Sequence, residues 1–204
     1  MIILFYNEIN IFNLYLNQIN KLELKYNNFF CINNYFCKKY KMNFLLLSND
    51  KGTIIYEGNI YDINKINRYK EFFIQDKRGG YIEAYILEKE NKIFLVEAVL
   101  DTILGDDLYY WNLENKQLIY KINIGITFTD INIWNADFIF ASLCDEEDYG
   151  FLLFNLKEKK IEKKFILNDK TQRIYGIKVL TDPKKGDYLI TLSFFGKLDL
   201  YKID

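Results

Sequence analysis

The chain has 204 residues, of which 50% are hydrophobic and 27% charged, so it can bury a sizeable core and is long enough for one or two domains. Its 27 basic residues nearly balance its 28 acidic ones, which argues against the positive field that nucleic-acid binding requires. The apolar opening 1–6 lacks the flanks of a signal peptide, and no run approaches the ~20 apolar residues of a membrane span. We therefore expect a cytoplasmic protein that binds neither nucleic acid nor membrane.

In chain order the sequence predicts short β-strands and nowhere sustains helical periodicity. Alternating or aromatic-rich segments separated by polar turns indicate the strands. The expected strands are 1–6, 8–14, 19–25, 28–33, 43–49, 53–56, 81–87, 92–99, 108–113, 118–124, 128–134, 137–144, 150–156, 161–167, 174–180, 187–194 and 197–203.

One unit of this pattern recurs along the chain. An aromatic strand ending in Trp-Asn-Leu at Trp111 is followed by a polar turn and a second strand, and the unit returns as Phe-Asn-Leu at Phe154. Phe12 begins an earlier copy, and Tyr56 and Tyr201 occupy the same place in weaker ones. These five positions are separated by 44, 55, 43 and 47 residues, which is the period of propeller blades.

A glycine precedes each of the later aromatic positions by four to six residues, and these glycines are Gly52, Gly105, Gly150 and Gly196. The Ser-x-Asp-x-Gly-Thr segment that contains Gly52 suits a tight hairpin, because glycine adopts positive φ without steric cost. Each repeat therefore reads as four short strands, a small antiparallel sheet that must stack on its neighbours.

Complete blades are expected at 28–75, 81–123 and 128–167, with incomplete ones at 1–25 and 174–204, all within one propeller domain spanning 1–204. Two arrangements fit this count. Residues 19–25 would close a ring by adding a fourth strand to residues 174–203, or the blades form an open arc. We favour the arc because closure leaves residues 1–14 without a place. The missing blades would then come from another chain or from a longer gene product.

These repeats resemble WD-repeat β-propellers. The residues that match the position of the family's Trp are Trp111, Phe154, Tyr56, Phe12 and Tyr201, and those that replace its Asp are Asn112, Asn155 and Asn13. The chain contains no histidine, so the family's hydrogen-bonded Asp-His-Ser/Thr-Trp tetrad cannot form. Ser48 and Ser142 keep the hydroxyl position of that tetrad. The resemblance implies a propeller that acts as a protein-interaction scaffold.

Little in the sequence indicates catalysis or cofactor binding. Without histidine no Ser-His-Asp or Cys-His arrangement exists. Cys31, Cys37 and Cys144 have neither disulfide nor metal spacing, and we expect buried free thiols. We expect no cofactor and no metal.

Two acidic turns are the exception. They contain Asp101, Asp106 and Asp107 in one blade and Asp145, Glu146, Glu147 and Asp148 in the next. They fit either a divalent-cation or basic-partner site or, as we expect, two solvated hairpin loops.

Residues 57–80 form the single insertion, which lengthens one repeat by about ten residues. Insertions in repeat folds often lie at a binding face, although ordinary drift in loop length is the explanation that we favour for this one. The basic residues along it are candidates for partner binding: Lys65, Arg68, Lys70, Lys77 and Arg78.

The expected function is that of a non-catalytic scaffold whose protein partners bind at exposed blade edges or at the insertion. One alternative is a propeller hydrolase with Asp101, Asp106 and Asp107 as its carboxylates. Another is a purely architectural part of a larger assembly.

Overall fold

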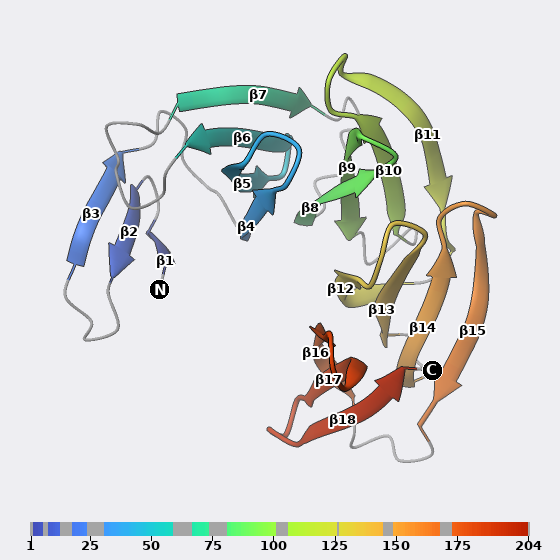
Figure 1. Cartoon of the computed structure of the whole chain (residues 1–204). Helices are drawn as coiled ribbons and strands as arrows, with labels where there is room; N and C mark the ends of the chain where they lie inside the picture. Colours follow the sequence, from blue (N-terminus) through green and yellow to red (C-terminus); the bar gives the residue numbers. More distant parts are fainter. Residues whose placement is uncertain are drawn as a thin grey trace. The chain divides into compact units, whose positions relative to one another are not determined.

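The computed structural model describes residues 2–5, 8–12, 18–23, 31–58, 67–73, 81–100, 106–125, 127–144, 149–167 and 173–203. The regular elements in these ranges are β-strands, arranged in antiparallel sheets (Figure 1). A search of these residues finds no helix with the length and apolar character needed to cross a membrane. The prediction of an all-β chain is confirmed.

The described strands form five sheets in which consecutive strands are neighbours. The first contains β1 (Ile2–Phe5), β2 (Glu8–Phe12) and β3 (Gln18–Glu23). The second contains β4 (Cys31–Cys37), β5 (Met42–Asn49), β6 (Gly52–Gly58) and β7 (Asn67–Phe73). The third contains β8 (Tyr81–Lys89), β9 (Lys92–Leu100), β10 (Asp107–Asn112) and β11 (Gln117–Asn123). The fourth contains β12 (Phe128–Ile133), β13 (Phe138–Cys144), β14 (Tyr149–Asn155) and β15 (Lys160–Ile166). The fifth contains β16 (Ile174–Asp182), β17 (Gly186–Ser193) and β18 (Leu198–Ile203).

The chain divides into two compact units. Unit 1 comprises Met1–Val99 and Tyr109–Lys121, and unit 2 comprises Leu100–Leu108 and Ile122–Asp204. In unit 1 the second sheet packs against the third through a core that includes Phe44, Leu46, Ile55, Ile86 and Leu95. Apolar residues on one face of each sheet meet there, which is the packing that amphipathic strands require.

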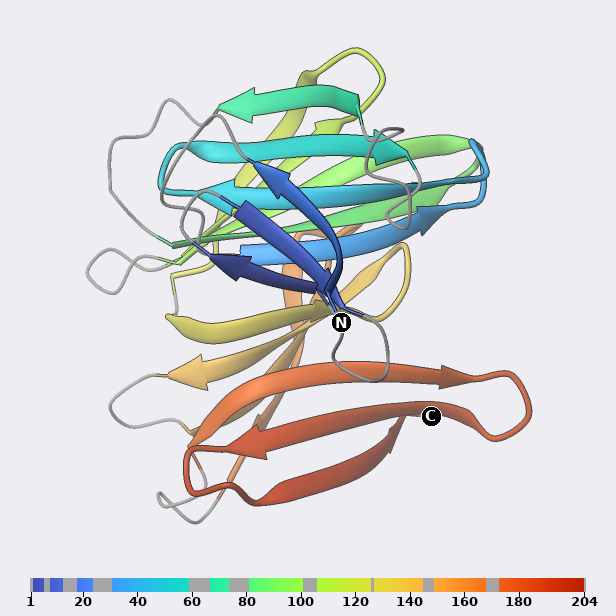
Figure 2. The same ribbon diagram turned by 90° about the vertical axis from the view of Figure 1, so that its left-hand side faces the viewer.

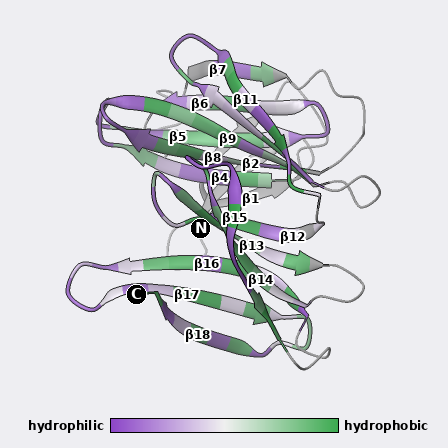
Figure 3. Ribbon diagram, turned by 90° about the vertical axis from the view of Figure 1, so that its right-hand side faces the viewer, coloured by the Kyte–Doolittle hydropathy of each residue, from purple (hydrophilic) through white to green (hydrophobic). Residues whose placement is uncertain are grey.

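Unit 2 has a core of its own between the fourth and fifth sheets. Phe140 and Phe151 pack there against Ile174, Ile177 and Leu189. Hydrophobic residues run along β14 and alternate with polar residues in the strands of the fifth sheet (Figure 3). The alternation leaves one face of the fifth sheet for this core and directs the other face outward.

The third and fourth sheets repeat the same turn between their last two strands. Asn112 Oδ1 accepts the N–H of Glu114 at 2.9 Å, and Asn155 Oδ1 accepts that of Glu158 at 2.9 Å. Each turn ends in a lysine with positive φ, Lys116 at 59° and Lys159 at 56°. The asparagines that occupy the Asp position of WD repeats therefore cap turns here, since a short amide side chain can bond the backbone that follows it.

Gly150 shows why a glycine stands at the start of β14. Its φ is 153°, and a Cβ at this position would lie 1.9 Å from the carbonyl oxygen of Phe165 in β15. Gly52 begins β6 with a similar φ of 150°. Gly196, with φ of 80°, lies in the β17–β18 turn, and Gly105 lies outside the described residues. The glycine pattern thus reflects backbone geometry at three of its four positions.

Candidate functional site

The expected insertion 57–80 contains a strand. β7 pairs with β6 as the fourth strand of the second sheet, with Ile55 opposite Lys70. The Nζ of Lys70 donates hydrogen bonds to the carbonyl oxygens of Leu113 at 2.5 Å and Glu114 at 2.7 Å, and burial lowers the pKa of the lysine. The side chain that we expected to meet a partner is therefore used inside unit 1. Lys65, Lys77, Arg78 and the side chain of Arg68 lie outside the described part of the chain.

The side chain of Glu114 also connects the third sheet to the second. Its carboxylate pairs with Lys39 and accepts a 3.0 Å hydrogen bond from the hydroxyl of Tyr40, both from the β4–β5 turn. The hydrogen bond from Lys39 is the main reason that the pKa of Glu114 is lowered. The basic and acidic groups near this turn thus connect the second sheet to the third.

The first acidic turn differs from the solvated loop that we expected. Asp106 and Asp107 are buried, at 0% and 2% exposure. Asp107 Oδ1 accepts a 2.9 Å hydrogen bond from Asn123 Nδ2, and the Asp106 carbonyl accepts the N–H of Ile124 at 2.9 Å. These contacts fasten the end of β11. The remaining acidic residues, Asp101, Asp145, Glu146, Glu147 and Asp148, lie outside the described residues. Within the described ranges no group of three or more His, Cys, Asp or Glu residues is placed to hold a metal ion.

The aromatic repeat position Trp111 packs between sheets in unit 1. Its ring meets Phe72 of β7 edge-on at 5.8 Å and stacks on Tyr109 at 6.4 Å. The indole N–H donates a 2.7 Å hydrogen bond to Oε2 of Glu97, a fully buried side chain of β9. Burial raises the pKa of Glu97 to about 7, and contacts with Thr53 and Trp111 offset part of that rise.

The two serines of the WD-like position bond to neighbouring hydroxyls. Ser48 Oγ lies 3.0 Å from Thr53 Oγ1, and Ser142 Oγ lies 2.6 Å from Thr129 Oγ1. Ser142 Oγ also accepts the N–H of Asp130 at 2.9 Å. These serines therefore stabilise adjacent strands without a histidine. The side chain of Cys37 is buried and that of Cys31 is partly exposed, while the side chain of Cys144 is outside the described residues.

Sequence reasoning missed two equivalent asparagines, each of which hydrogen-bonds to the backbone of the next sheet. Asn33 Nδ2 of β4 donates to the carbonyl of Ala84 in β8 at 2.9 Å. Asn132 Oδ1 of β12 accepts the N–H of Val179 in β16 at 3.1 Å. The two asparagines are 99 residues apart and occupy equivalent places in the first strands of their sheets. Each lies opposite the residue two positions before the serine of the second strand, Ser48 or Ser142. The asparagines themselves were the signal that could have indicated these contacts, because asparagine is depleted in β-strands.

Trp134 was also missed. Its indole N–H donates a 2.6 Å hydrogen bond to Oδ2 of Asp187 in β17. The ring packs on Phe138 and Phe140, with centroids at 5.7 and 5.9 Å. Trp134 therefore connects the fourth sheet to the fifth inside unit 2.

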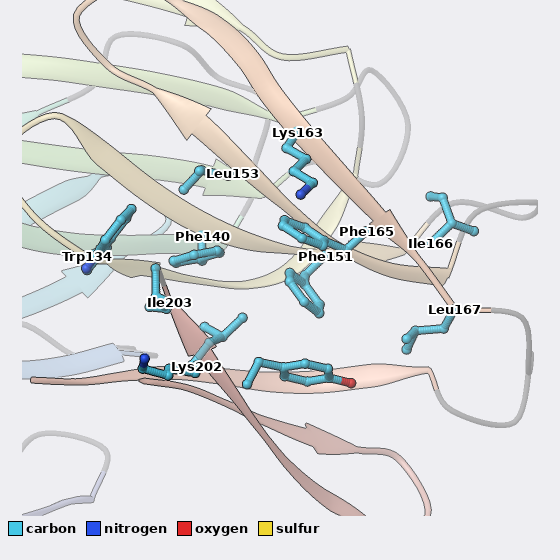
Figure 4. A pocket seen from close by; sticks show the side chains of 12 residues that line it. Trp134, Phe140, Phe151, Leu153, Lys163, Phe165, Ile166, Leu167, Lys202 and Ile203 are labelled. Atoms are coloured by element: carbon cyan, nitrogen blue, oxygen red, sulfur yellow. The ribbon is translucent and has the colours of Figure 1, made fainter. Parts of the chain in front are cut away.

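A cavity of about 510 Å³ lies between the fourth and fifth sheets of unit 2. Phe151 is at its centre, 4.6 Å from the ring of Phe165 in β15, 6.2 Å from Phe140 and 5.2 Å from Tyr201 in β18. Figure 4 shows these phenylalanines together with Lys163. The remaining lining residues are Trp134, Leu153, Lys163, Ile166, Leu167, Leu189, Lys202 and Ile203. The cavity is aromatic, and of the described residues that line it two are lysines and none is acidic.

The fifth sheet also has an exposed apolar face. Leu192 lies opposite Leu198 in the β17–β18 ladder, and both side chains point away from the core of unit 2 together with Leu180 and Leu200. We name these four residues the outer leucine face. Leu198 and Leu200 are 64% and 58% exposed. Figure 2 shows the three strands that carry this face side by side. Tyr175, Phe194 and Phe195 are exposed as well.

Comparisons with known proteins relate the chain to solved structures only. No protein family model and no curated protein matches it. The structure is similar to that of BBS1N in complex with ARL6DN, with a TM-score of 0.66 and 14% identity over 98% of this chain and 60% of that chain. It is similar to the Dos1 propeller, with a TM-score of 0.61 and 10% identity over 96% and 62%. The chain has the β-propeller fold.

This propeller spans about 60% of the length of the structures it matches. A third similar structure is Kuenenia stuttgartiensis hydrazine synthase, with a TM-score of 0.65 and 12% identity over 97% of this chain and 59% of that chain. Likeness at such identities establishes the fold, and the sheets described above are its blades. The expectation of propeller blades is confirmed, whereas membership of the WD-repeat family stays a prediction.

Proposed function

We propose that this propeller is a non-catalytic scaffold that binds protein partners in the cytoplasm, through the outer leucine face of its last described blade. The carrying observation is the exposure of Leu192, Leu198 and Leu200 on a sheet whose other face is packed in a core. A sheet with one solvated face normally alternates apolar and polar residues. A contiguous apolar patch on the second face is typical of a surface that another protein covers.

The structural neighbours support this proposal by analogy. BBS1N was solved in complex with ARL6DN, so a propeller similar to this one forms a complex with another protein. The fold alone does not specify function, because propellers carry out many roles. The exposed leucines are therefore the stronger support.

The hydrolase alternative receives less support from the carboxylates that it would use. A carboxylate site requires side chains that reach a substrate, and Asp106 and Asp107 are buried at the end of β11. We therefore place the function in binding and not in catalysis.

The test is capture of partners from the native source with a tagged chain and two variants. Leu198→Lys/Leu200→Lys places charges on the outer leucine face, and Lys184→Glu/Lys185→Glu changes the exposed β16–β17 turn as a matched control. Circular dichroism and thermal melting verify that all three chains fold. We expect the same protein to be retained by the wild type and the control and lost from the leucine variant. Equal retention by all three, or no specific protein with any of them, would contradict the proposal.

A further inference from the structure

The fifth sheet has three described strands where the three sheets before it have four. Tyr201 of β18 occupies the repeat position that Phe154 occupies in β14, so β18 is equivalent to the third strand of a four-stranded blade. β14 pairs with β13 on one side and with β15 on the other, whereas β18 pairs with β17 alone among the described strands. The outer edge of β18 is therefore the place of a fourth strand.

The backbone groups at this edge follow from the ladder register. The N–H of Ser193 donates to the carbonyl of Lys197 at 2.8 Å, and Leu192 lies opposite Leu198. Hydrogen-bonded and non-bonded pairs alternate in an antiparallel ladder. The N–H and C=O groups of Leu198 and Leu200 therefore point away from β17, toward the open edge.

The aromatic cavity of unit 2 borders the same edge. Tyr201 and Ile203 of β18 form one wall, and Phe165 and Lys163 of β15 form another. In unit 1 a fourth strand, β11, lies beside the third strand β10, and its Lys121 Nζ is 5.0 Å from the centroid of the Tyr109 ring of β10. A strand beside β18 would project alternate side chains into the cavity in the same way.

The positive charge at the cavity favours a fourth strand that carries an acidic side chain. The ammonium group of Lys163 lies over the Phe165 ring at 4.8 Å. The side chain of Lys202 lies on the opposite face of β18 from Tyr201, so Lys163 supplies the positive charge. An acidic side chain directed into the cavity would meet a cation there, while neighbouring apolar side chains would pack on Phe151 and Phe165.

We propose that the outer edge of β18 accepts an extended segment of the protein partner as a fourth strand, with aromatic and acidic residues at alternate positions filling the cavity beside Phe151, Phe165 and Lys163. Main-chain hydrogen bonds from Leu198 and Leu200 supply the pairing, and the cavity supplies the selectivity. This inference rests on the proposed role in protein binding and identifies the kind of segment that is bound.

The test uses a synthetic peptide and the whole chain. The peptide has the seven-residue length of β15, capped ends, phenylalanine at the second and sixth positions, glutamate at the fourth and threonine elsewhere. Amide exchange is followed by NMR. We expect slow exchange at Asp199 and Tyr201 with or without peptide, and at least ~10-fold slower exchange at Leu198 and Leu200 when the peptide is bound. A peptide of the same composition in scrambled order is the control.

Charge reversal tests the cavity itself. Lys163→Glu should weaken binding of the glutamate peptide at least ~10-fold and should favour a peptide with lysine at the fourth position. Lys164→Glu, on the opposite face of β15, should leave binding of the glutamate peptide unchanged. Equal binding by wild type and Lys163→Glu would overturn the inference, as would slow exchange at Leu198 and Leu200 of the monomeric chain in the absence of peptide, because the chain would then supply its own fourth strand.

These outcomes separate this inference from the proposed function. If the outer leucine face captures a partner but the peptide does not bind at β18, the scaffold proposal stands and the strand proposal fails. If the peptide binds as described but no partner is captured, the strand site stands and the scaffold proposal fails.

Discussion

The indole N–H of Trp111 donates a 2.7 Å hydrogen bond to Oε2 of Glu97, whose side chain is fully buried in unit 1. Burial raises the pKa of this carboxyl group from 4.5 to about 7 in the folded chain. The folded state therefore binds a proton more tightly than the unfolded state does, and this contribution to stability is present below about pH 4.5 and lost as the pH rises through about 7. At about 1.4 kcal/mol per pKa unit, the loss is on the order of 3 kcal/mol.

Glu97→Gln is expected to remove this pH dependence. Glutamine keeps an acceptor for the Trp111 indole and has no charge to bury. Urea unfolding of the wild type and of Glu97→Gln at pH 4.5 and pH 8 gives the free energy of unfolding of each chain at both pH values. The effect of Glu97 is the difference between the two chains in how much that free energy changes with pH. Parallel pH dependences would show that Glu97 titrates normally.

Trp111→Ala is expected to lower the free energy of unfolding by ~3–5 kcal/mol, because it removes a large ring from between two sheets and leaves Glu97 without its donor. Trp111→Phe keeps an aromatic ring against Phe72 and Tyr109 but loses the N–H, so it should cost ~1–3 kcal/mol. Chemical denaturation of both variants distinguishes packing from hydrogen bonding. A small effect of the alanine variant would place the ring on the surface.

Gly150→Ala is expected to destabilise the chain by on the order of 3 kcal/mol or more, since the new Cβ would lie 1.9 Å from a backbone oxygen of β15 and φ is positive. Gly186→Ala is the matched control. Gly186 has φ of 94° but nothing lies within 4 Å of its Cβ position, so its cost should be limited to ~1–2 kcal/mol of backbone strain. Thermal melting compares the two, and equal losses would rule out the contact with Phe165 as the cause.

Lys70→Ala is expected to cost ~1–3 kcal/mol, because the carbonyl groups of Leu113 and Glu114 lose a charged donor. Lys39→Ala breaks an exposed ion pair with Glu114 and should cost less than ~1 kcal/mol. Urea unfolding of the two variants provides the comparison. A larger loss for Lys39→Ala would mean that the exposed pair, and not the backbone contact, connects these turns.

The repeat period allowed most strands to be predicted, because each aromatic position and its turn are local features. Asn112 and Asn155 were correctly matched to each other, although their turn-capping role became evident only from the structure. The segment 57–80 was interpreted as an insertion whose basic residues are candidates for partner binding. Its strand β7 bonds through Lys70 to residues 43 and 44 positions away, and no local pattern reports such a contact.

Burial of polar side chains was the least predictable property. Asp106 and Asp107 stand in a run that reads as an exposed turn, yet Asn123 from the next strand covers the second of them. The cavity of unit 2 was likewise not predicted, because it depends on Phe165 of the fourth sheet and Tyr201 of the fifth both packing on Phe151. Both features depend on contacts between residues that are far apart in the sequence, and a local pattern does not report such contacts.

The association state of the purified chain tests most directly whether the outer leucine face and the β18 edge are uncovered binding surfaces. Size-exclusion chromatography with light scattering should give a mass above that of the 24.5 kDa monomer for the wild type, and a mass closer to the monomer for Leu198→Lys/Leu200→Lys. A wild-type monomer that resists association at every concentration, with amide exchange protection extending through β18, would contradict the account and would mean that the propeller closes on itself.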